Sequence, residues 1–545
     1  MRLSVAFIFL IMVGSSCMLK KIPVDLIVSN ARVYTVDTAF TMVESFCVSN
    51  GKIIATGSSE EIKRRYTSDN FLDLSGRFVY PGLIDAHCHF TGYGLSLMHA
   101  DLTGTASFEE VVSVLKKHHE KVSSEWVLGR GWDQNDWAVK EFPDRQLLDQ
   151  AFPLNPVLIT RIDGHAAVAN QKALELAGIS GNTRVAGGSL LEKNGRLTGV
   201  LIDNAIDLVR RMVPEPGEEE TKRALIMAQE NCFAVGLTGV HEAGLDYASI
   251  RMIDSLQKAG VLRMRIYAMI NTDRDNLENF MYKGIFETPY LNVRSVKLIA
   301  DGALGSRGAL MRSPYYDDPG NCGLLVTPLE KLKKICIQAY QTGYQVNTHC
   351  IGDSANRLIL RLYGSVLKRP NDRRWRIEHA QVVDPHDLPL FRDYSIIPSV
   401  QPAHATSDML WAADRLGKER IGHAYALRKL LEQNGYLAAG SDFPVEHINP
   451  FYGFYAAVVR KDLKGAPPEG FQADDALSRK EALRAMTIWA ARAAFEEHKK
   501  GSIEKDKYAD FIVTDEDLME TAPEKLPFIR VLATYIAGKE VYRRE

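Results

Sequence analysis

The sequence has few cysteines, and none of them lies in a paired spacing. The seven are spread over 545 residues, without a Cys-x-x-Cys pair, at positions 17, 47, 88, 232, 322, 336 and 350. This distribution does not indicate a disulfide framework. Cys88 and Cys350 each adjoin a histidine discussed below, and neighbouring residues of a strand face opposite ways. We therefore expect both to be small, buried apolar side chains.

The sequence also lacks an excess of positive charge. Its formal net charge is −2, so no surplus of cations is available to neutralise the phosphates of a nucleic acid. Hydrophobic residues make up 46% and charged residues 25%, which is typical of a globular protein. At this length the chain is expected to hold two domains or one very large one.

Long apolar runs are absent after the N-terminus, where no stretch approaches the ~20 residues needed to cross a bilayer. At the N-terminus itself, Arg2, an apolar stretch at 3–13 and the small residues before Cys17 predict a signal peptide over 1–17. These small residues resemble a bacterial lipoprotein signal, although Gly14 stands where leucine is usual. We therefore expect export, either with Cys17 lipidated as an anchor to a cell-envelope membrane or as a periplasmic protein.

The two ends of the chain have a similar sequence pattern. Residues 22–80 and 491–545 hold short strand-like runs and turns, and Asn50-Gly51 is a strong two-residue hairpin signal. This pattern predicts one small β-sandwich domain that is assembled from both chain ends.

The middle, 81–490, alternates apolar strand-like runs with helical periods. Strands are expected near 155–160, 293–300, 345–349, 375–379, 396–400 and 436–442, and helices at 329–342 and 354–368. Such alternation predicts a parallel sheet, and the spacing of the runs predicts a barrel whose strand C-termini share one rim. The segment at about 118–215 is too long for a simple connection, so we expect an insertion over the barrel mouth. Its residues Trp126, Trp132 and Trp137 either face the mouth or form a local core.

Six polar residues follow the expected barrel strands at or near their C-termini. They are His87, His89, Lys297, His349, His379 and Asp442. His87 and His89 share one face of a strand with Asp85. Four imidazoles and one carboxylate suit zinc or a similar divalent ion. An inward Lys297 ammonium would face a costly desolvation. It is therefore expected either to point outward or to have reacted with carbon dioxide, giving a carbamate that bridges two metals.

The motifs that contain these residues resemble those of the amidohydrolase superfamily, specifically the branch with N-substituted formamide deformylases. They lie at 81–89, 296–307, 347–355, 376–381, 440–445 and 501–513. The resemblance implies a distorted (β/α)8 TIM barrel with a β-sandwich built from both ends. It also implies two divalent ions, zinc being the expected one. His87, His89 and Asp442 would hold the more buried ion, His349 and His379 the second, and a carbamate on Lys297 would bridge them.

The implied activity is hydrolysis of a non-peptide C–N bond in a small amide or formamide by a metal-activated hydroxide. Asp442 would act as general base and then as acid. His165 could donate a hydrogen bond to the oxyanion or be structural. His404 and Trp132 are candidate substrate contacts.

Two other functions remain open at this point. One is a mononuclear deaminase or cyclic-amide hydrolase of the same superfamily, favoured by an unmodified Lys297 and a single ion. The other is a non-catalytic binding protein at the cell surface, since a fold alone does not imply function. Such proteins typically lose ligands, and here all six are present.

Overall fold

The centre of the molecule is a parallel sheet of eight strands that curls into a nearly closed barrel. The computed structural model describes residues 20–122, 124–368 and 371–545. All eight strands pair in parallel, in chain order. They are β10 (Leu83–Cys88), β17 (Leu237–Leu245), β18 (Arg265–Ile270), β20 (Leu291–Ile299), β21 (Gln345–Cys350), β22 (Arg376–His379), β23 (Ile397–Val400) and β24 (Ala438–Ala439). The prediction of an α/β barrel is confirmed.

The first and last strands meet through backbone hydrogen bonds just beyond the end of β24. The Asp442 N–H donates to the His87 carbonyl at 2.8 Å, and the His89 N–H donates to the Phe443 carbonyl at 2.8 Å. These bonds bring two motifs that are 350 residues apart in the chain to one point of the rim. A short strand, β19 (Phe286–Glu287), pairs antiparallel with the first half of β20, at Asn292 and Val293.

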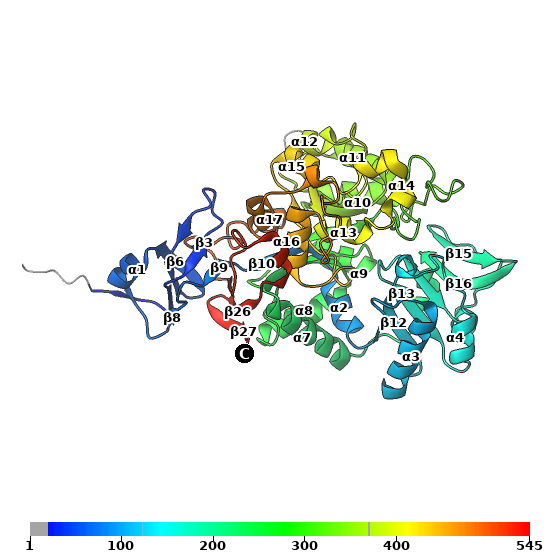
Figure 1. Cartoon of the computed structure of the whole chain (residues 1–545), viewed down its shortest axis with the longest axis horizontal. Coiled ribbons are helices and arrows are strands. Elements are labelled where there is room, and N and C mark those ends of the chain that lie inside the picture. The colour runs from blue at the N-terminus through cyan, green and yellow to red at the C-terminus, as the bar shows by residue number, and fades with distance from the viewer. Residues whose placement is uncertain (1–19, 123, 369–370) are drawn as a thin grey trace, which may run out of the picture.

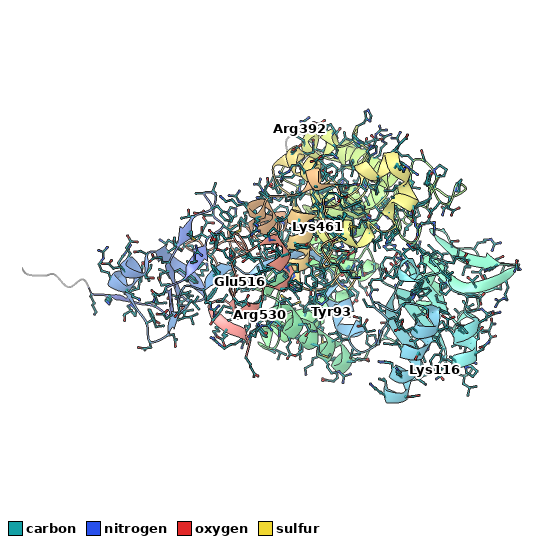
Figure 2. All side chains as sticks on the ribbon, in the orientation of Figure 1. Tyr93, Lys116, Arg392, Lys461, Glu516 and Arg530 are labelled. Carbon is teal, nitrogen blue, oxygen red and sulfur yellow. The ribbon has the colours of Figure 1, made fainter. Side chains whose placement is uncertain are left out.

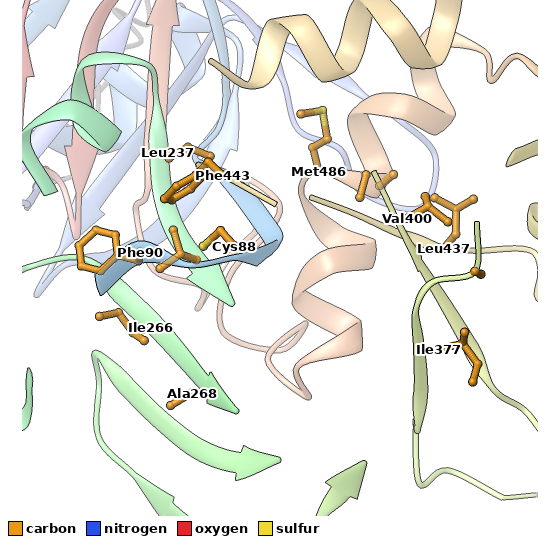
Figure 3. Close-up of a cluster of buried hydrophobic side chains, with 14 of the residues drawn as sticks. Cys88, Phe90, Leu237, Ile266, Ala268, Ile377, Val400, Leu437, Phe443 and Met486 are labelled. Atoms are coloured by element: carbon orange, nitrogen blue, oxygen red, sulfur yellow. The ribbon is translucent and has the colours of Figure 1, made fainter. Parts of the chain in front are cut away.

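Apolar side chains fill the space between the barrel strands and the helices around them. Figure 3 shows part of this core, with Cys88 and Phe90 near Leu237 and Phe443. Helices α10 (Leu329–Thr342) and α11 (Asp353–Val366) match the two predicted helices. α10 ends where Gly343 takes φ 80°, a left-handed conformation that costs glycine little.

A second sheet lies between β10 and β17 in the sequence. Its order is β11-β12-β13-β14-β16-β15. The strands are β11 (Ala100–Asp101), β12 (Val127–Trp132), β13 (Val157–Arg161), β14 (Ala166–Ala169), β15 (Gly188–Lys193) and β16 (Arg196–Asp203). With α3 (Phe108–Val122) it projects to one end of the molecule (Figure 1). The apolar run at 155–160 therefore belongs to this insertion sheet and not to the barrel.

The two chain ends form two further sheets at the opposite end, where the blue and red segments of Figure 1 lie together. One has the order β6-β5-β2-β8 and the other β27-β26-β25-β9-β3-β4. Their strands are β2 (Leu26–Ser29), β3 (Arg32–Tyr34), β4 (Met42–Val43), β5 (Ser45–Ser49), β6 (Lys52–Gly57), β8 (Phe71–Asp73), β9 (Phe78–Pro81), β25 (Phe511–Thr514), β26 (Val531–Ile536) and β27 (Lys539–Arg543). The β5–β6 hairpin turns at Asn50 and Gly51, both with positive φ, as the sequence predicts.

The larger of these sheets packs on both of its faces. Phe511 and Val513 join a cluster with Phe46 of the other sheet, whereas Ile512, between them, joins the core of the barrel. This alternation ties the terminal strands to the barrel as well as to each other. A separate sandwich domain, and the division of the chain into domains, stay predictions.

Charged side chains such as Lys116 and Arg392 lie at the periphery (Figure 2). The six described cysteines are all free, and Cys88 and Cys350 are buried, as expected. Among the described residues, none of the helices combines the length and the apolar character that a membrane crossing needs. The predicted signal peptide and Cys17 lie outside the described residues, so their roles stay predictions.

Candidate metal centre

Three of the predicted ligands converge where β10 meets the end of β24. The Oδ1 atom of Asp442 lies 3.2 Å from Nε2 of His89 and 3.6 Å from Nε2 of His87. Ligands about 2.0 Å from a tetrahedral ion are roughly 3.3 Å apart. His87, His89 and Asp442 therefore have the spacing of three ligand atoms around one ion.

Lys297 points into the same space from β20. Its Nζ lies 3.1 Å from Nε2 of His87, and the residue is buried. The Lys297 side chain therefore points inward, and the alternative of an outward orientation is wrong. Burial lowers the pKa of the amine, which favours its neutral form.

A second group of possible ligand atoms shares Asp442 and includes His379 and His404. Nε2 of His404 lies 3.8 Å from Oδ2 of Asp442, and the His379 and His404 rings stack at 6.1 Å. His349, the other predicted ligand, has its ring 4.6 Å from that of His379. Its Nε2 lies 3.4 Å from the Gly302 carbonyl, and His349 is not part of the group formed by His379, His404 and Asp442. The structure thus adds His404 to the residues that could contact an ion.

Each of three histidines is oriented by a polar partner on the ring's other nitrogen. His87 Nδ1 lies 2.5 Å from Glu378 Oε2, and His379 Nδ1 lies 2.7 Å from Gln401 Oε1. Nδ1 of His404 lies 2.9 Å from Oε1 of Glu446. Such partners fix the tautomer and aim Nε2 of each ring at the centre. Glu378, Gln401 and Glu446 were not predicted from the sequence. Strand alternation would place Glu378 on the opposite face from its neighbour His379, but His379 has φ 73°, which interrupts the alternation at this point.

Burial keeps the central imidazoles neutral. It lowers the pKa of His87, and it lowers the pKa values of His349 and His379 well below the usual histidine value. Burial alone would raise the pKa of Asp442, but its contacts with His404 and His89 hold that pKa well below the usual range. Neutral imidazoles and an ionised carboxylate are the forms that ligate metals.

Two of the central residues have unusual backbone conformations. His379 has φ 73° and Asp442 has φ 62°, values that are uncommon for residues other than glycine. Two residues before Asp442, a Cβ on Gly440 would lie only 2.4 Å from the backbone nitrogen of His87. The close approach of β10 and the end of β24 therefore depends on that glycine. Backbone strain of this kind persists where the surroundings impose it, as at functional sites.

The donor set fits a divalent metal ion. Oδ1 of Asp442 is buried and accepts no hydrogen bond from the described residues, yet it faces two imidazole nitrogens. Leaving a buried carboxylate oxygen without a partner costs free energy, which a cation at this point would offset. The His/Asp set suits zinc and similar ions.

The insertion supplies the opposite wall. His165 follows β13, its Nδ1 lies 2.6 Å from Asp203 Oδ1, and its ring lies 4.9 Å from that of His349. Burial opposes protonation of His165, but the Asp203 contact outweighs it and raises the pKa of the imidazole. With Nδ1 held by Asp203, Nε2 remains to donate toward the centre. Asp203 was not found from the sequence, since it is 38 residues away on β16.

One cavity joins these two walls. It is lined by His165, His349, His379, His404 and Asp442, and also by Arg161, Asp408 and Trp411. Trp132 is not part of this lining: it is fully buried in the insertion core, where its Nε1 donates to the Ile159 carbonyl at 3.1 Å. The structure therefore does not bring Trp132 to the cavity, and Trp411 is the tryptophan found there. The reason is an irregularity in β12: the pairing register shifts between Arg130 and Trp132, where Gly131 has φ 109°, so that Trp132 turns toward the insertion core.

Comparison with known proteins places these features in a family. The model of the amidohydrolase family matches residues 70–542. The chain is 35% identical over 541 residues to Protein LONG AFTER FAR-RED 3 of Arabidopsis thaliana, covering 95% of this chain and 91% of that protein. It is 27% identical over 546 residues to the N-substituted formamide deformylase of Arthrobacter pascens, covering 95% and 98% of the two chains.

Solved structures show the same similarity. An uncharacterized metal-dependent hydrolase from Pyrococcus horikoshii OT3 superimposes with a TM-score of 0.75 at 30% identity. The match covers 91% of this chain and 99% of that one. The similarity therefore extends over the barrel, the insertion and most of both chain ends.

Proposed function

Because this chain belongs to the amidohydrolase family of metal-dependent hydrolases, we propose that it hydrolyses a non-peptide C–N bond in a small amide, a formamide being the first candidate. The name of the Arthrobacter pascens relative supports the formamide as a starting point. The observation that carries the proposal is the position of Asp442. One of its carboxylate oxygens faces His87 and His89, and the other faces His404 across 3.8 Å.

We propose that two divalent ions, zinc being the expected one, are held in this centre. His87, His89 and Asp442 would hold one ion, and His349 and His379 the other. Lys297, whose Nζ lies 3.1 Å from Nε2 of His87, would also help to hold the ions. Its neutral amine would add to carbon dioxide, releasing one proton and giving a carbamate, an anionic oxygen ligand. Divalent ions in such a site activate water and polarise a carbonyl group.

The residues of the chain would move the protons. Asp442, whose lowered pKa favours the ionised form, would accept a proton from the attacking water through Oδ2, the oxygen that faces His404. It would then transfer that proton to the departing nitrogen. His404, whose pKa is raised well above the usual value because Asp442 and Glu446 outweigh the effect of burial, would donate a hydrogen bond to the substrate.

His165 would stabilise the negative charge that develops on the carbonyl oxygen. Asp203 holds its Nδ1, so the ring is oriented before the substrate arrives, and its raised pKa favours the donating form. A preoriented donor of this kind is more effective in a buried cavity than in water. Trp411, which lines the same cavity from the segment after β23, would contact an apolar group next to the scissile bond.

The test is a substrate screen with the purified, metal-loaded protein. N-benzylformamide and N-alkylformamides are assayed for formate release, and amidine-like heterocycles for ammonia release. Formate release supports the proposal. Ammonia release with one ion per chain would identify a deaminase instead. Binding without turnover of any compound would point to a binding protein, and inactivity toward every amide with the ions bound would contradict the proposed hydrolase.

A further inference from the structure

A second cavity adjoins the metal centre on the side of the insertion. It is lined by His89 and His165 together with Arg130, Asp203 and Arg210. His165, Asp163 and Val445 line both cavities, so the two meet at the metal centre. The His89 side chain is 40% exposed, which leaves it accessible from this second cavity. A substrate bound at the centre could therefore extend one of its ends toward Arg130.

Arg130 has no carboxylate partner. It lies on β12, and its Nη2 donates to the Ile162 carbonyl at 2.8 Å. Its Nε is buried and has no acceptor, and no carboxylate oxygen of the described residues lies within 4.0 Å of its guanidinium. Burial lowers the pKa of this arginine, while the charges of Asp442 and Asp163 oppose that effect. A guanidinium still stays protonated at neutral pH, so an unmatched cation faces the cavity.

The other charged residues around the second cavity each have an ionic partner. Asp163 accepts from Arg161 Nη1 at 2.6 Å and from the His165 N–H at 3.0 Å. Oδ1 of Asp203 lies 2.6 Å from His165, while its Oδ2 is buried without a hydrogen bond from the described residues. Arg210, at the exposed rim, lies 3.4 Å from Asp207. Among the described residues of this lining, Arg130 is therefore the arginine without a carboxylate partner.

The backbone beside Arg130 leaves its guanidinium accessible. Gly164 has φ 75°, and a Cβ at this position would lie 3.6 Å from Nη1 of Arg130. A larger residue at position 164 would cover the guanidinium and would also adopt a strained conformation. The glycine thus leaves the donors of Arg130 open on the side next to His165.

We propose that Arg130 binds a carboxylate group of the substrate, so that the natural substrate is an amide with a carboxylate beyond the scissile bond on the insertion side. The reaction named in this inference rests on the proposed amide hydrolysis. The binding of a carboxylate by Arg130 does not depend on it. Guanidinium and carboxylate pair through two parallel hydrogen bonds, which gives orientation as well as affinity. A dianionic phosphate fits less well, because Asp163, Asp203 and Asp207 line the same cavity and would repel a second charge.

The first experiment uses the wild-type, metal-loaded protein alone. Turnover of N-benzylformamide is compared with that of its ortho-, meta- and para-carboxylate derivatives and of a matched phosphonate. We expect kcat/KM for at least one carboxylate to exceed that for the neutral amide about tenfold or more. A protein that prefers the neutral amide over all three carboxylates would overturn the proposal, and a preference for the phosphonate would replace carboxylate with phosphate.

The second experiment tests Arg130 itself and does not depend on turnover. The ligands are the amine products of hydrolysis: benzylamine from the neutral amide, and the aminomethylbenzoate from the carboxylate derivative that is turned over best. Their binding is measured by calorimetry for wild type, Arg130→Gln and Arg130→Lys. Arg130→Gln should reduce the preference for the carboxylate about tenfold, and Arg130→Lys, which keeps the charge but not the planar pair of donors, should reduce it less. Arg196→Gln, an exposed arginine of the same insertion that pairs with Asp144, is the matched control and should leave the preference unchanged.

The two proposals can fail separately. A carboxylate preference that disappears with Arg130→Gln, in a protein that hydrolyses none of the amides, keeps the binding site and refutes the amide hydrolysis. Hydrolysis of the amides without any preference for a carboxylate keeps the amide hydrolysis and refutes the binding site. A preference that persists in Arg130→Gln would mean that the carboxylate binds elsewhere, for instance to an ion, and would refute the role of Arg130.

Discussion

The barrel rim and the insertion face each other across one cavity, but they hold their charges differently. On the rim, Asp442 keeps a buried oxygen without a hydrogen bond, and His379 and Asp442 both have left-handed backbones. On the insertion, Asp163 pairs with Arg161 and Oδ1 of Asp203 with His165, although Oδ2 of Asp203 is also buried without a hydrogen bond from the described residues. On the rim an unpartnered carboxylate oxygen faces two imidazoles, where a cation would fit, whereas on the insertion a cation, Arg130, faces the second cavity without a carboxylate partner among the described residues.

This difference predicts two kinds of mutational effect. Changes on the rim should remove the reaction, because the reacting groups and the ion depend on one another there. Changes on the insertion should alter rate or selectivity in steps, because each group acts alone.

The largest effect is expected for Asp442→Asn. Asparagine keeps the shape but loses the charge and the ability to accept the proton, so kcat should fall about 10³-fold or more. Circular dichroism should show an unchanged fold. Asp474→Asn, at an exposed position far from the cavity lining, is the control and should leave kcat unchanged. An Asp442→Asn protein with near wild-type activity would remove the basis of the proposed mechanism.

A smaller loss is expected for His165→Ala on the insertion. Removing one donor to a developing oxyanion lowers kcat about 10²–10³-fold, with KM affected less. His386→Ala is the control, since that side chain is 90% exposed. A purely structural role for His165 would instead lower the melting temperature without this separation of kcat from KM.

The partner of His87 gives a third, weaker test. Glu378→Gln keeps the side-chain volume but removes the charge that holds His87 Nδ1. Metal affinity should fall about 10–100-fold, measured by competition with a chromophoric chelator, and activity should recover with excess ion. Glu432→Gln, the same substitution at an exposed position of the α15 helix (Leu427–Asn434), should have no effect on the ion. Unchanged affinity in Glu378→Gln would show that the orientation of His87 does not depend on this contact.

The smallest effect is expected far from both walls. Hydrogen bonds from Arg428 lower the pKa of Glu481 to about 2 from its ordinary value of 4.5. A lowered carboxyl pKa stabilises the fold above the ordinary value, and this contribution is lost as pH falls from 4.5 toward about 2. Glu481→Gln should therefore lower the free energy of unfolding by about 1 kcal/mol at pH 7, because the pair is partly solvated.

The measurement for Glu481→Gln is urea unfolding at several pH values, with kcat as a second readout. The difference from wild type should shrink as pH falls below 4.5, and kcat should not change. A difference that is independent of pH would mean that the ion pair is not its cause.

Much of the barrel could be predicted from the sequence. The apolar runs around Lys297, His349 and His379 became β20, β21 and β22 in the expected order, because parallel strands buried on both faces are nearly continuous apolar runs. The run at 155–160 has the same composition but pairs within the insertion. Composition identifies a buried strand and does not say to which sheet it belongs.

The site was predictable where its residues lie at strand ends and not where they depend on contacts across sheets. His87, His89 and Asp442 follow strands whose rim positions are set by the barrel, and they converge as expected. Asp203, Arg130 and Trp411 reach the cavities only because the insertion and the loop after β23 fold over the mouth. No spacing in the chain encodes that approach, and the same limitation explains why Trp132 was expected in the cavity.

The central claim is that side chains of the barrel rim bind a catalytic cation. The most direct test is elemental analysis of the purified protein, combined with activity before chelation, after chelation and after the ion is restored. We expect a bound divalent ion in the wild type, activity that disappears with the ion and returns with it, and loss of the ion in a His87→Ala, His89→Ala double variant. Full activity of the ion-free protein would contradict the account.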